Sequence, residues 1–183
     1  MDSDPRIETT LRRGSELWRD FCARRASEFH RVIPADHALA IDALTAQRDR
    51  ANTFLELGSA TGVITILADL LGFEAHGIEI EPELVETAES LAEEVGSSAE
   101  FCLGSFVPEA YRDQVELLES DYLTPTEGAD AYAEMGMEIA DFDLVYAYPW
   151  PGEEDWLIEM VRRFGGPRTT LMIYTVRDGF EVL

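Results

Sequence analysis

A chain of 183 residues is long enough for one domain with its own hydrophobic core. Its composition, 46% apolar and 10% aromatic, excludes a disordered, collagen-like or low-complexity protein. The charges are unbalanced, because 37 acidic residues face 14 arginines and no lysine, which gives a net charge of −23. Nine arginines and nine acidic residues cancel within 1–50, so residues 51–183 carry the whole excess. Such a surface repels phosphate backbones and anionic lipids, which disfavours a nucleic-acid or membrane partner.

Cysteine and histidine usage excludes further classes of protein. Cys22 and Cys102 are too few for a disulfide scaffold, and their spacing relative to the three histidines predicts no metal site. No run of 18 apolar residues is present, so we expect no membrane span. The first ten residues lack the basic and apolar regions of a secretory signal. The expected location is therefore cytoplasmic.

Residues 1–50 are predicted to be a helical extension. One apolar stripe with spacings of three, four and seven predicts a helix over 5–31, formed by Ile7, Leu11, Trp18, Phe21, Cys22 and Phe29. Pro34 breaks this pattern, and Asp36 can cap a second, short helix. We predict that 1–50 form a lid whose stripe packs near Tyr148 and Trp150. The alternative is a dimerisation arm.

Residues 51–183 alternate between strand and helix patterns. The predicted strands are 53–58, 74–80, 99–106, 142–150 and 169–176. The predicted helices are 62–72, 82–96, 108–120 and 153–165, with an irregular insertion over 119–141 that contains one helical turn. The strands are apolar runs, as expected when both faces are covered, so the predicted class is α/β with a doubly wound, mainly parallel sheet. After a turn at 177–179 only four residues remain, which predicts a shortened C-terminal end. The open sheet edge and the N-terminal helices are therefore the two surfaces expected for a homodimer interface.

The turn after the first strand has the chemistry of a ligand site. Residues 56–62 read Glu-Leu-Gly-Ser-Ala-Thr-Gly, and a glycine-rich turn into a helix offers backbone N–H groups and a positive dipole end. Glu79, 21 residues beyond Gly58, ends the second strand and can accept both hydroxyls of a ribose. A dinucleotide fingerprint requires glycine where this chain has Ala60 and Val63. These departures disfavour a nicotinamide-binding protein.

The run FLELGSATG, followed by HGIEIEPELVETAESLAEE, resembles motif I and the next acidic motif of the class I S-adenosylmethionine-dependent methyltransferases. Their motif I, an acid followed by three glycines at alternate positions, is matched at Glu56, Gly58 and Gly62. It departs at Ala60, where alanine is compatible if its φ is negative. The resemblance covers about 53–176. It implies a Rossmann-like methyltransferase fold that uses S-adenosylmethionine, releases S-adenosylhomocysteine and needs no metal.

The resemblance also implies which residues contact the cofactor. They are Glu56, Leu57, Gly58, Ser59, Ala60, Gly62, Glu79, Ile80, Ser105 and Phe106. Glu79 is implied to bind the ribose hydroxyls, and Ile80 to lie against adenine. Ser105 stands where many members have an acid for the adenine amino group, so it is either an adenine contact or a turn residue.

The resemblance implies that the end of the fourth strand faces the methyl group that is transferred. The predicted substrate pocket is Tyr146, Tyr148, Pro149 and Trp150, and the alternative buries these aromatic residues under the N-terminal helices. A general base is needed only if the acceptor starts protonated, and no catalytic residue is assigned, although Glu153 and Tyr148 are candidates. We predict an enzyme that transfers a methyl group from S-adenosylmethionine to an unidentified small-molecule or protein acceptor. The alternative is a non-catalytic S-adenosylmethionine-binding sensor or partner subunit.

Overall fold

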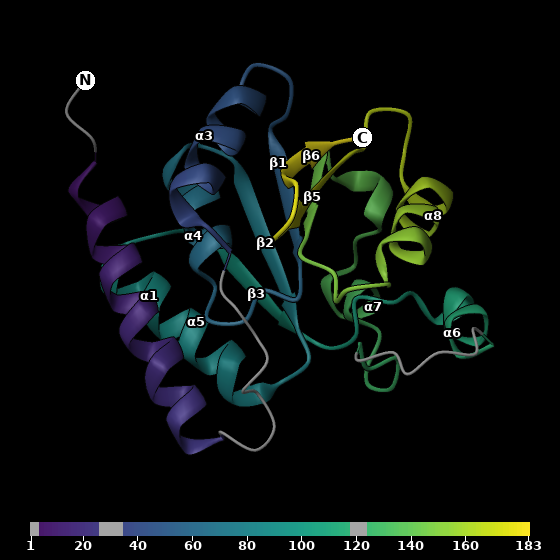
Figure 1. Ribbon diagram of the computed structural model, residues 1–183, viewed down its shortest axis with the longest axis horizontal. Coiled ribbons are helices and arrows are strands. Elements are labelled where there is room, and N and C mark those ends of the chain that lie inside the picture. The colour runs from purple at the N-terminus through teal and green to yellow at the C-terminus, as the bar shows by residue number, and fades with distance from the viewer. Residues whose placement is uncertain (1–3, 26–34, 118–123) are drawn as a thin grey trace.

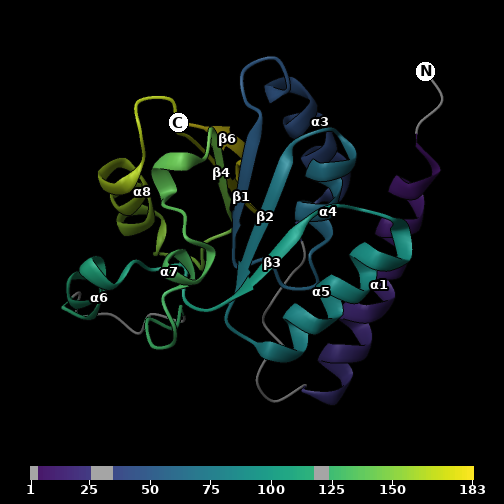
Figure 2. The same cartoon turned by 180° about the vertical axis from the view of Figure 1, so that it is seen from behind.

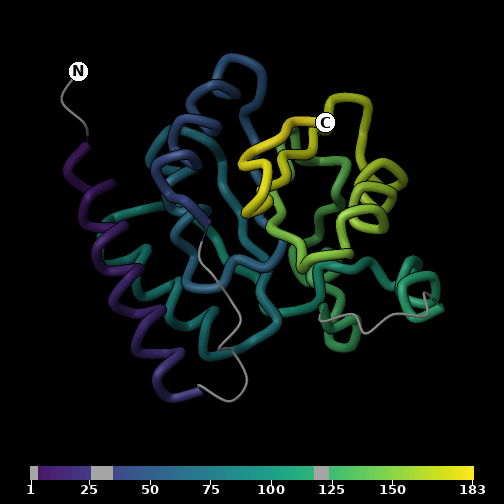
Figure 3. Tube along the Cα trace, viewed as in Figure 1, coloured from purple at the N-terminus to yellow at the C-terminus, as the bar shows by residue number. Residues whose placement is uncertain are grey.

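The computed structural model describes residues 4–25, 35–117 and 124–183. Their centre is a six-stranded sheet with the order β3-β2-β1-β4-β5-β6. Its strands are β1 (Thr53–Leu57), β2 (Glu74–Glu79), β3 (Glu100–Leu103), β4 (Leu144–Ala147), β5 (Thr170–Thr175) and β6 (Gly179–Val182). The first five strands are parallel, and β6 returns antiparallel to β5. The predicted doubly wound sheet is confirmed, and its strand order reverses between β1 and β4 (Figure 3).

Helices cover both faces of the sheet (Figures 1 and 2). One face packs against α3 (His37–Gln47), α4 (Val63–Leu70) and α5 (Pro82–Val95). The other packs against α6 (Glu109–Glu116), α7 (Ala131–Met135), η1 (Ile139–Asp141) and α8 (Glu154–Phe164). Neighbouring strand residues such as Phe54 and Leu55 pack into the hydrophobic cores on opposite faces of the sheet, because side chains alternate across a strand. This arrangement explains why the strand sequences are apolar throughout.

Most predicted elements are present, with shorter bounds. Asp36 caps α3 through N–H groups at 3.0 and 3.2 Å, and Gly96 ends α5 with a φ of 66°. The one helical turn expected within 119–141 is α7, which begins after the capping residue Asp130. The third strand stops at Leu103, earlier than expected. Residues 26–34 and 118–123, which include the ends of two predicted helices, lie outside the described residues.

The N-terminal helix α1 (Pro5–Arg24) packs on α4 and α5 as a third layer (Figures 1 and 2). Its Gly14 permits a close approach, since a Cβ there would lie 2.2 Å from the Val63 side chain. Ion pairs join α1 and its C-cap to α5 and its N-cap. They are Arg13 with Glu94 at 2.9 Å, Arg24 with Glu83 at 2.5 Å, and Arg25 with Glu81 at 3.2 Å. The proposed lid role of residues 1–50 stays a prediction.

No helix among residues 4–25, 35–117 and 124–183 is long and apolar enough to cross a membrane.

Candidate ligand site at the carboxyl end of the sheet

The strand ends bring six residues to one level of the sheet. Leu57 of β1 is in register with both Ile78 and Ala147, and Ala147 is in register with Ile173. The residues that follow therefore stand side by side, and the pairing of β2 with β3 and of β5 with β6 extends the line. We call this line the strand-end row: Leu103, Glu79, Gly58, Tyr148, Tyr174 and Phe180. It crosses the point where the strand order reverses, which is where ligands bind in open α/β sheets.

The turn after β1 requires unusual backbone angles. Gly58 and Gly62 have φ values of 80° and 75°, in the left-handed region that favours glycine. Ala60 also has a positive φ of 47°, so the expected negative angle is wrong. The turn imposes this conformation on a residue with a Cβ, which carries a strain of about 1–2 kcal/mol. A Cβ at Gly62 would lie 2.6 Å from Phe101 and 2.7 Å from Ala88, whereas one at Gly58 has only Phe106 near it, at 3.9 Å.

Several N–H groups of this turn already have protein partners. Those of Gly58 and Ser59 both donate to the Ile78 carbonyl at 2.9 Å. The Ala60 N–H donates to Glu79 at 2.8 Å. Within the described residues, the N–H groups of Thr61 and Val63 have no protein acceptor. These two groups, at the start of α4, are the donors that the turn offers to an anionic ligand group.

Glu79 is a buried carboxylate that holds the turn to the next helix. It is 9% exposed and accepts N–H bonds from Ala60 at 2.8 Å, Ile80 at 2.8 Å and Glu81 at 3.0 Å. Burial raises its pKa, although the three N–H bonds oppose that change. A carboxylate has about four acceptor positions, so one remains for a ribose hydroxyl. The second hydroxyl would have to share an oxygen with a backbone N–H.

Glu56 lies two residues before Gly58, on the same sheet face. Its carboxylate accepts the Thr65 N–H at 2.9 Å and the Thr65 hydroxyl at 2.5 Å. Burial raises the pKa of Glu56 to about 8, against these hydrogen bonds. Tyr146 is its register partner on β4. Glu56 therefore holds the first helical turn of α4 to β1, beneath the glycine-rich turn.

Ser105 forms an isolated parallel bridge with Asp130, and its contact with adenine stays a prediction. It is 2% exposed, and its hydroxyl accepts the Val107 N–H at 3.2 Å. Its own N–H donates to the Ala129 carbonyl at 2.8 Å. The Phe106 ring stacks on Trp156, with centroids 6.5 Å apart. The hydroxyl and the N–H of Ser105 thus both bond to backbone groups of the chain. The Phe106 ring forms a wall next to Gly58.

The segment around Gly128, predicted only as part of an irregular insertion, also reaches this region. A Cβ at Gly128 would lie 3.4 Å from Ile80 and 3.9 Å from the Ser105 nitrogen. The Arg112 guanidinium holds the segment by donating to the Gly128 carbonyl at 2.9 Å. Asp130 caps α7, the helical turn that follows this segment. The segment therefore borders the place predicted for adenine.

The β4–β6 end of the row is aromatic. The Tyr148 and Tyr174 rings meet edge to face at 4.9 Å, and Tyr174 meets Phe180 at 4.7 Å. Tyr146 stacks on Phe180 at 5.8 Å. Burial raises the pKa of both Tyr146 and Tyr148. We call these four residues the aromatic cluster; sequence patterns did not bring Tyr174 and Phe180 to it because they lie within β5 and β6, far along the chain.

The other predicted acceptor residues support the loop after β4. Pro149 is buried and Trp150 is half-buried. The Trp150 carbonyl accepts the Glu153 N–H at 2.9 Å. Glu153, one candidate base, is 2% exposed and accepts both the N–H, at 3.1 Å, and the hydroxyl of Thr124. It joins two loops and lies outside the row.

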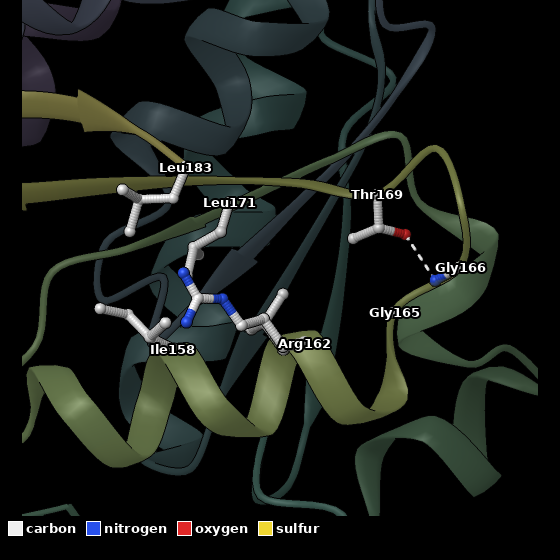
Figure 4. Close-up of a pocket in the computed structure, with 8 residues that line it drawn as sticks. Ile158, Arg162, Gly165, Gly166, Thr169, Leu171 and Leu183 are labelled. Carbon is white, nitrogen blue, oxygen red and sulfur yellow. Dashed lines mark hydrogen bonds between the residues drawn. The ribbon is translucent and has the colours of Figure 1, made fainter.

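Two hollows in the described surface lie away from the row. One of about 190 Å³ lies between α8 and β5, where Thr169 accepts the Gly166 N–H at 2.9 Å (Figure 4). The other, about 720 Å³, runs between α6 and α7. Neither is lined by a residue of the strand-end row. Among the described residues, no three His, Cys, Asp or Glu side chains are grouped to hold a metal.

Comparison with known proteins gives no sequence match. A scan against protein-family models finds none, and a search of curated proteins finds none. Solved structures do match the fold. An RNA methyltransferase from Salinibacter ruber, in complex with S-adenosyl-L-homocysteine, has a TM-score of 0.53 and 24% identity, covering 77% of this chain and 76% of that one.

Two further structures match over more of this chain. An O-methyltransferase from Bacillus cereus, in complex with S-adenosylhomocysteine, has a TM-score of 0.58 and 15% identity, covering 97% of this chain and 69% of that one. An O-methyltransferase from Streptomyces achromogenes, involved in tomaymycin synthesis and in complex with S-adenosylmethionine, has a TM-score of 0.54 and 14% identity. The alignment covers 94% of this chain and 66% of that one. At these identities the likeness shows the fold, and it is the fold that the resemblance of motif I implied.

Proposed function

We propose that this chain, which has the fold of S-adenosylmethionine-dependent methyltransferases, binds S-adenosylmethionine and transfers its methyl group to an acceptor. One observation carries the proposal. The glycine turn and Glu79 stand side by side in the strand-end row, at the reversal of strand order. The Salinibacter, Bacillus and Streptomyces structures hold S-adenosylmethionine or its product on the same fold.

The residues of the turn fit the parts of this ligand. Gly58 has no side chain and is exposed, so a ligand can lie against its backbone. The free N–H groups of Thr61 and Val63, with the N-terminus of α4 behind them, suit the carboxylate of the methionine part. Glu79 accepts a ribose hydroxyl, and the partly exposed Ile80 offers an apolar surface to adenine.

The ligand supplies an activated methyl group, so the chain mainly has to align the acceptor with it. Alignment alone can account for a large part of the rate of such a displacement. The Glu153 carboxylate is engaged by Thr124. The raised pKa of Tyr148 keeps its phenol protonated. These two candidate bases are therefore poorly placed, which favours an acceptor that is nucleophilic without help from the protein. No feature of the described residues favours the non-catalytic alternative.

Calorimetric titration tests the proposal directly. We expect S-adenosylmethionine and S-adenosylhomocysteine to bind and NAD to give no heat of binding. The position of the site is tested with Gly58→Val, which places a branched side chain where the ligand meets the backbone. Binding of NAD without a response to the other two ligands would overturn the proposal.

A further inference from the structure

The chain from Gly128 to Ala131 runs beside Ser105, just beyond the end of β3. The Ser105 N–H donates to the Ala129 carbonyl at 2.8 Å, and the Ala131 N–H donates to the Ser105 carbonyl at 3.4 Å. These two bonds form the parallel bridge between Ser105 and Asp130. The bridge places this stretch of chain on the side of the strand-end row that holds Leu103 and Glu79.

Gly128 faces the residue that follows Glu79. It is exposed, and a Cβ on it would point at Ile80, 3.4 Å from the end of that side chain. In a nucleoside the base is bonded directly to the ribose, so a ribose held by Glu79 brings the base next to the half-buried Ile80. Gly128 is therefore one wall of the proposed adenine site.

Arg112 of α6 fixes this wall through the backbone. Its Nη1 donates to the Gly128 carbonyl at 2.9 Å, and its Nε donates to the Val107 carbonyl at 3.3 Å. Val107 directly follows Phe106, whose ring lies next to Gly58. One planar guanidinium thus ties together the two chain segments that flank the proposed adenine site. A lysine ammonium, as a single point charge, cannot hold both carbonyls in the same fixed geometry.

The remaining nitrogen of Arg112 is unpaired. Its Nη2 is buried and has no hydrogen-bond partner within the part of the chain that the structure describes. A buried donor of this kind is uncommon in folded proteins and calls for a reason beyond packing. The two bonds that the guanidinium does make both fix backbone carbonyls beside the strand-end row.

We infer that Arg112 is a positioning residue for the adenine of S-adenosylmethionine, which it holds in place through Gly128 and Val107. The inference rests on the proposed function. Without the guanidinium, Gly128 is free to move away from Ile80, so the adenine loses packing. The ribose and the methionine part keep their partners at Glu79 and in the glycine-rich turn.

Saturation-transfer NMR on S-adenosylhomocysteine tests the inference, because it reports how closely each part of a ligand meets the protein. The signals of the adenine protons are compared with those of the ribose protons, and calorimetry gives the affinity. We expect Arg112→Ala to bind about tenfold more weakly, with a lower ratio of adenine to ribose signal. An unchanged ratio would mean that Arg112 only supports the fold and would overturn the inference, whatever happens to the affinity.

Two further variants control the test. Arg112→Lys keeps the charge and one donor, so it should lose only about threefold in affinity, and it carries the test if Arg112→Ala does not fold. Arg163→Ala removes an arginine that bonds α6 through Gln114 at 2.9 Å, and it should change neither the affinity nor the ratio. No binding of S-adenosylhomocysteine by the unmodified chain would defeat the proposed function and this inference with it. Normal binding with the same ratio in every variant would defeat this inference alone.

Discussion

The two ends of the strand-end row are built differently. The β1–β2 end has one short turn with a positive φ at Gly58, Ala60 and Gly62, and a buried carboxylate that takes three N–H bonds. The β4–β6 end has tyrosine and phenylalanine rings from separate strands, which meet through ring contacts at 4.7 to 5.8 Å. The first end therefore depends on backbone geometry, and the second on side-chain packing. Substitutions at the first end should accordingly change the fold and the ligand affinity together.

The largest effect is expected at Gly62. Gly62→Ala combines a left-handed backbone with contacts under 3 Å to Phe101 and Ala88, and it should lower the free energy of unfolding by about 3–5 kcal/mol. Gly58→Ala has the same backbone angle but open space, and should lower it by only about 1–2 kcal/mol. Urea unfolding of both variants measures the difference. Equal losses would show that the neighbours yield and that backbone strain alone matters.

Glu56 gives a pH dependence that sharpens the comparison, because it interacts electrostatically with Glu79 at one end and with Tyr146 of the aromatic cluster at the other. Its pKa is about 8 in the folded chain and about 4.3 when unfolded, so the folded state holds the proton more tightly. The free energy of unfolding should therefore fall as pH rises from about 4.3 to 8, by about 2–4 kcal/mol from this group. Glu56→Gln keeps an acceptor for Thr65 and should remove that part of the slope. Parallel stability curves for the two proteins would contradict the assignment.

Glu79→Ala should weaken S-adenosylhomocysteine binding by about 2–3 kcal/mol, because it removes a charge-assisted bond to the ribose. The loss of an acceptor for three N–H groups should also lower the melting temperature without ligand. Glu81→Ala, which removes a surface ion pair with Arg25, is the matched control and should have an effect below about 1 kcal/mol. Unchanged calorimetric affinity in Glu79→Ala would take this residue out of the site.

The smallest effect is expected at Ala60. Ala60→Gly relieves the strain of a positive φ but adds freedom to the unfolded chain, for a net gain of about 0.5 kcal/mol in unfolding free energy. The same substitution at Ala68, inside α4, should instead destabilise by about 1 kcal/mol or more. Denaturant titration of both variants shows the opposite signs. A loss of stability at Ala60 would mean that its methyl group packs usefully in the turn.

The predictability of the two ends follows from how far apart their residues lie in the sequence. The turn and Glu79 belong to one strand–helix–strand unit, so apolar runs, glycines and a spaced acid were enough to locate them. The positive φ of Ala60 could not be read, because alanine gives no sign of a left-handed turn. Tyr174 and Phe180 reach Tyr148 only through the pairing of β4, β5 and β6. That register depends on the packing of the whole sheet.

The contact between Gly14 and Val63 links the N-terminal helix to the turn mechanically. Val63 is the first residue of α4 and directly follows Gly62, so α1 rests on the element that a ligand at the turn would stiffen. Local opening of α1 and a loosening of the turn are then parts of one fluctuation. Amide hydrogen exchange in α1 should accordingly slow when the site is filled, although α1 lies on the outer side of α4 and α5.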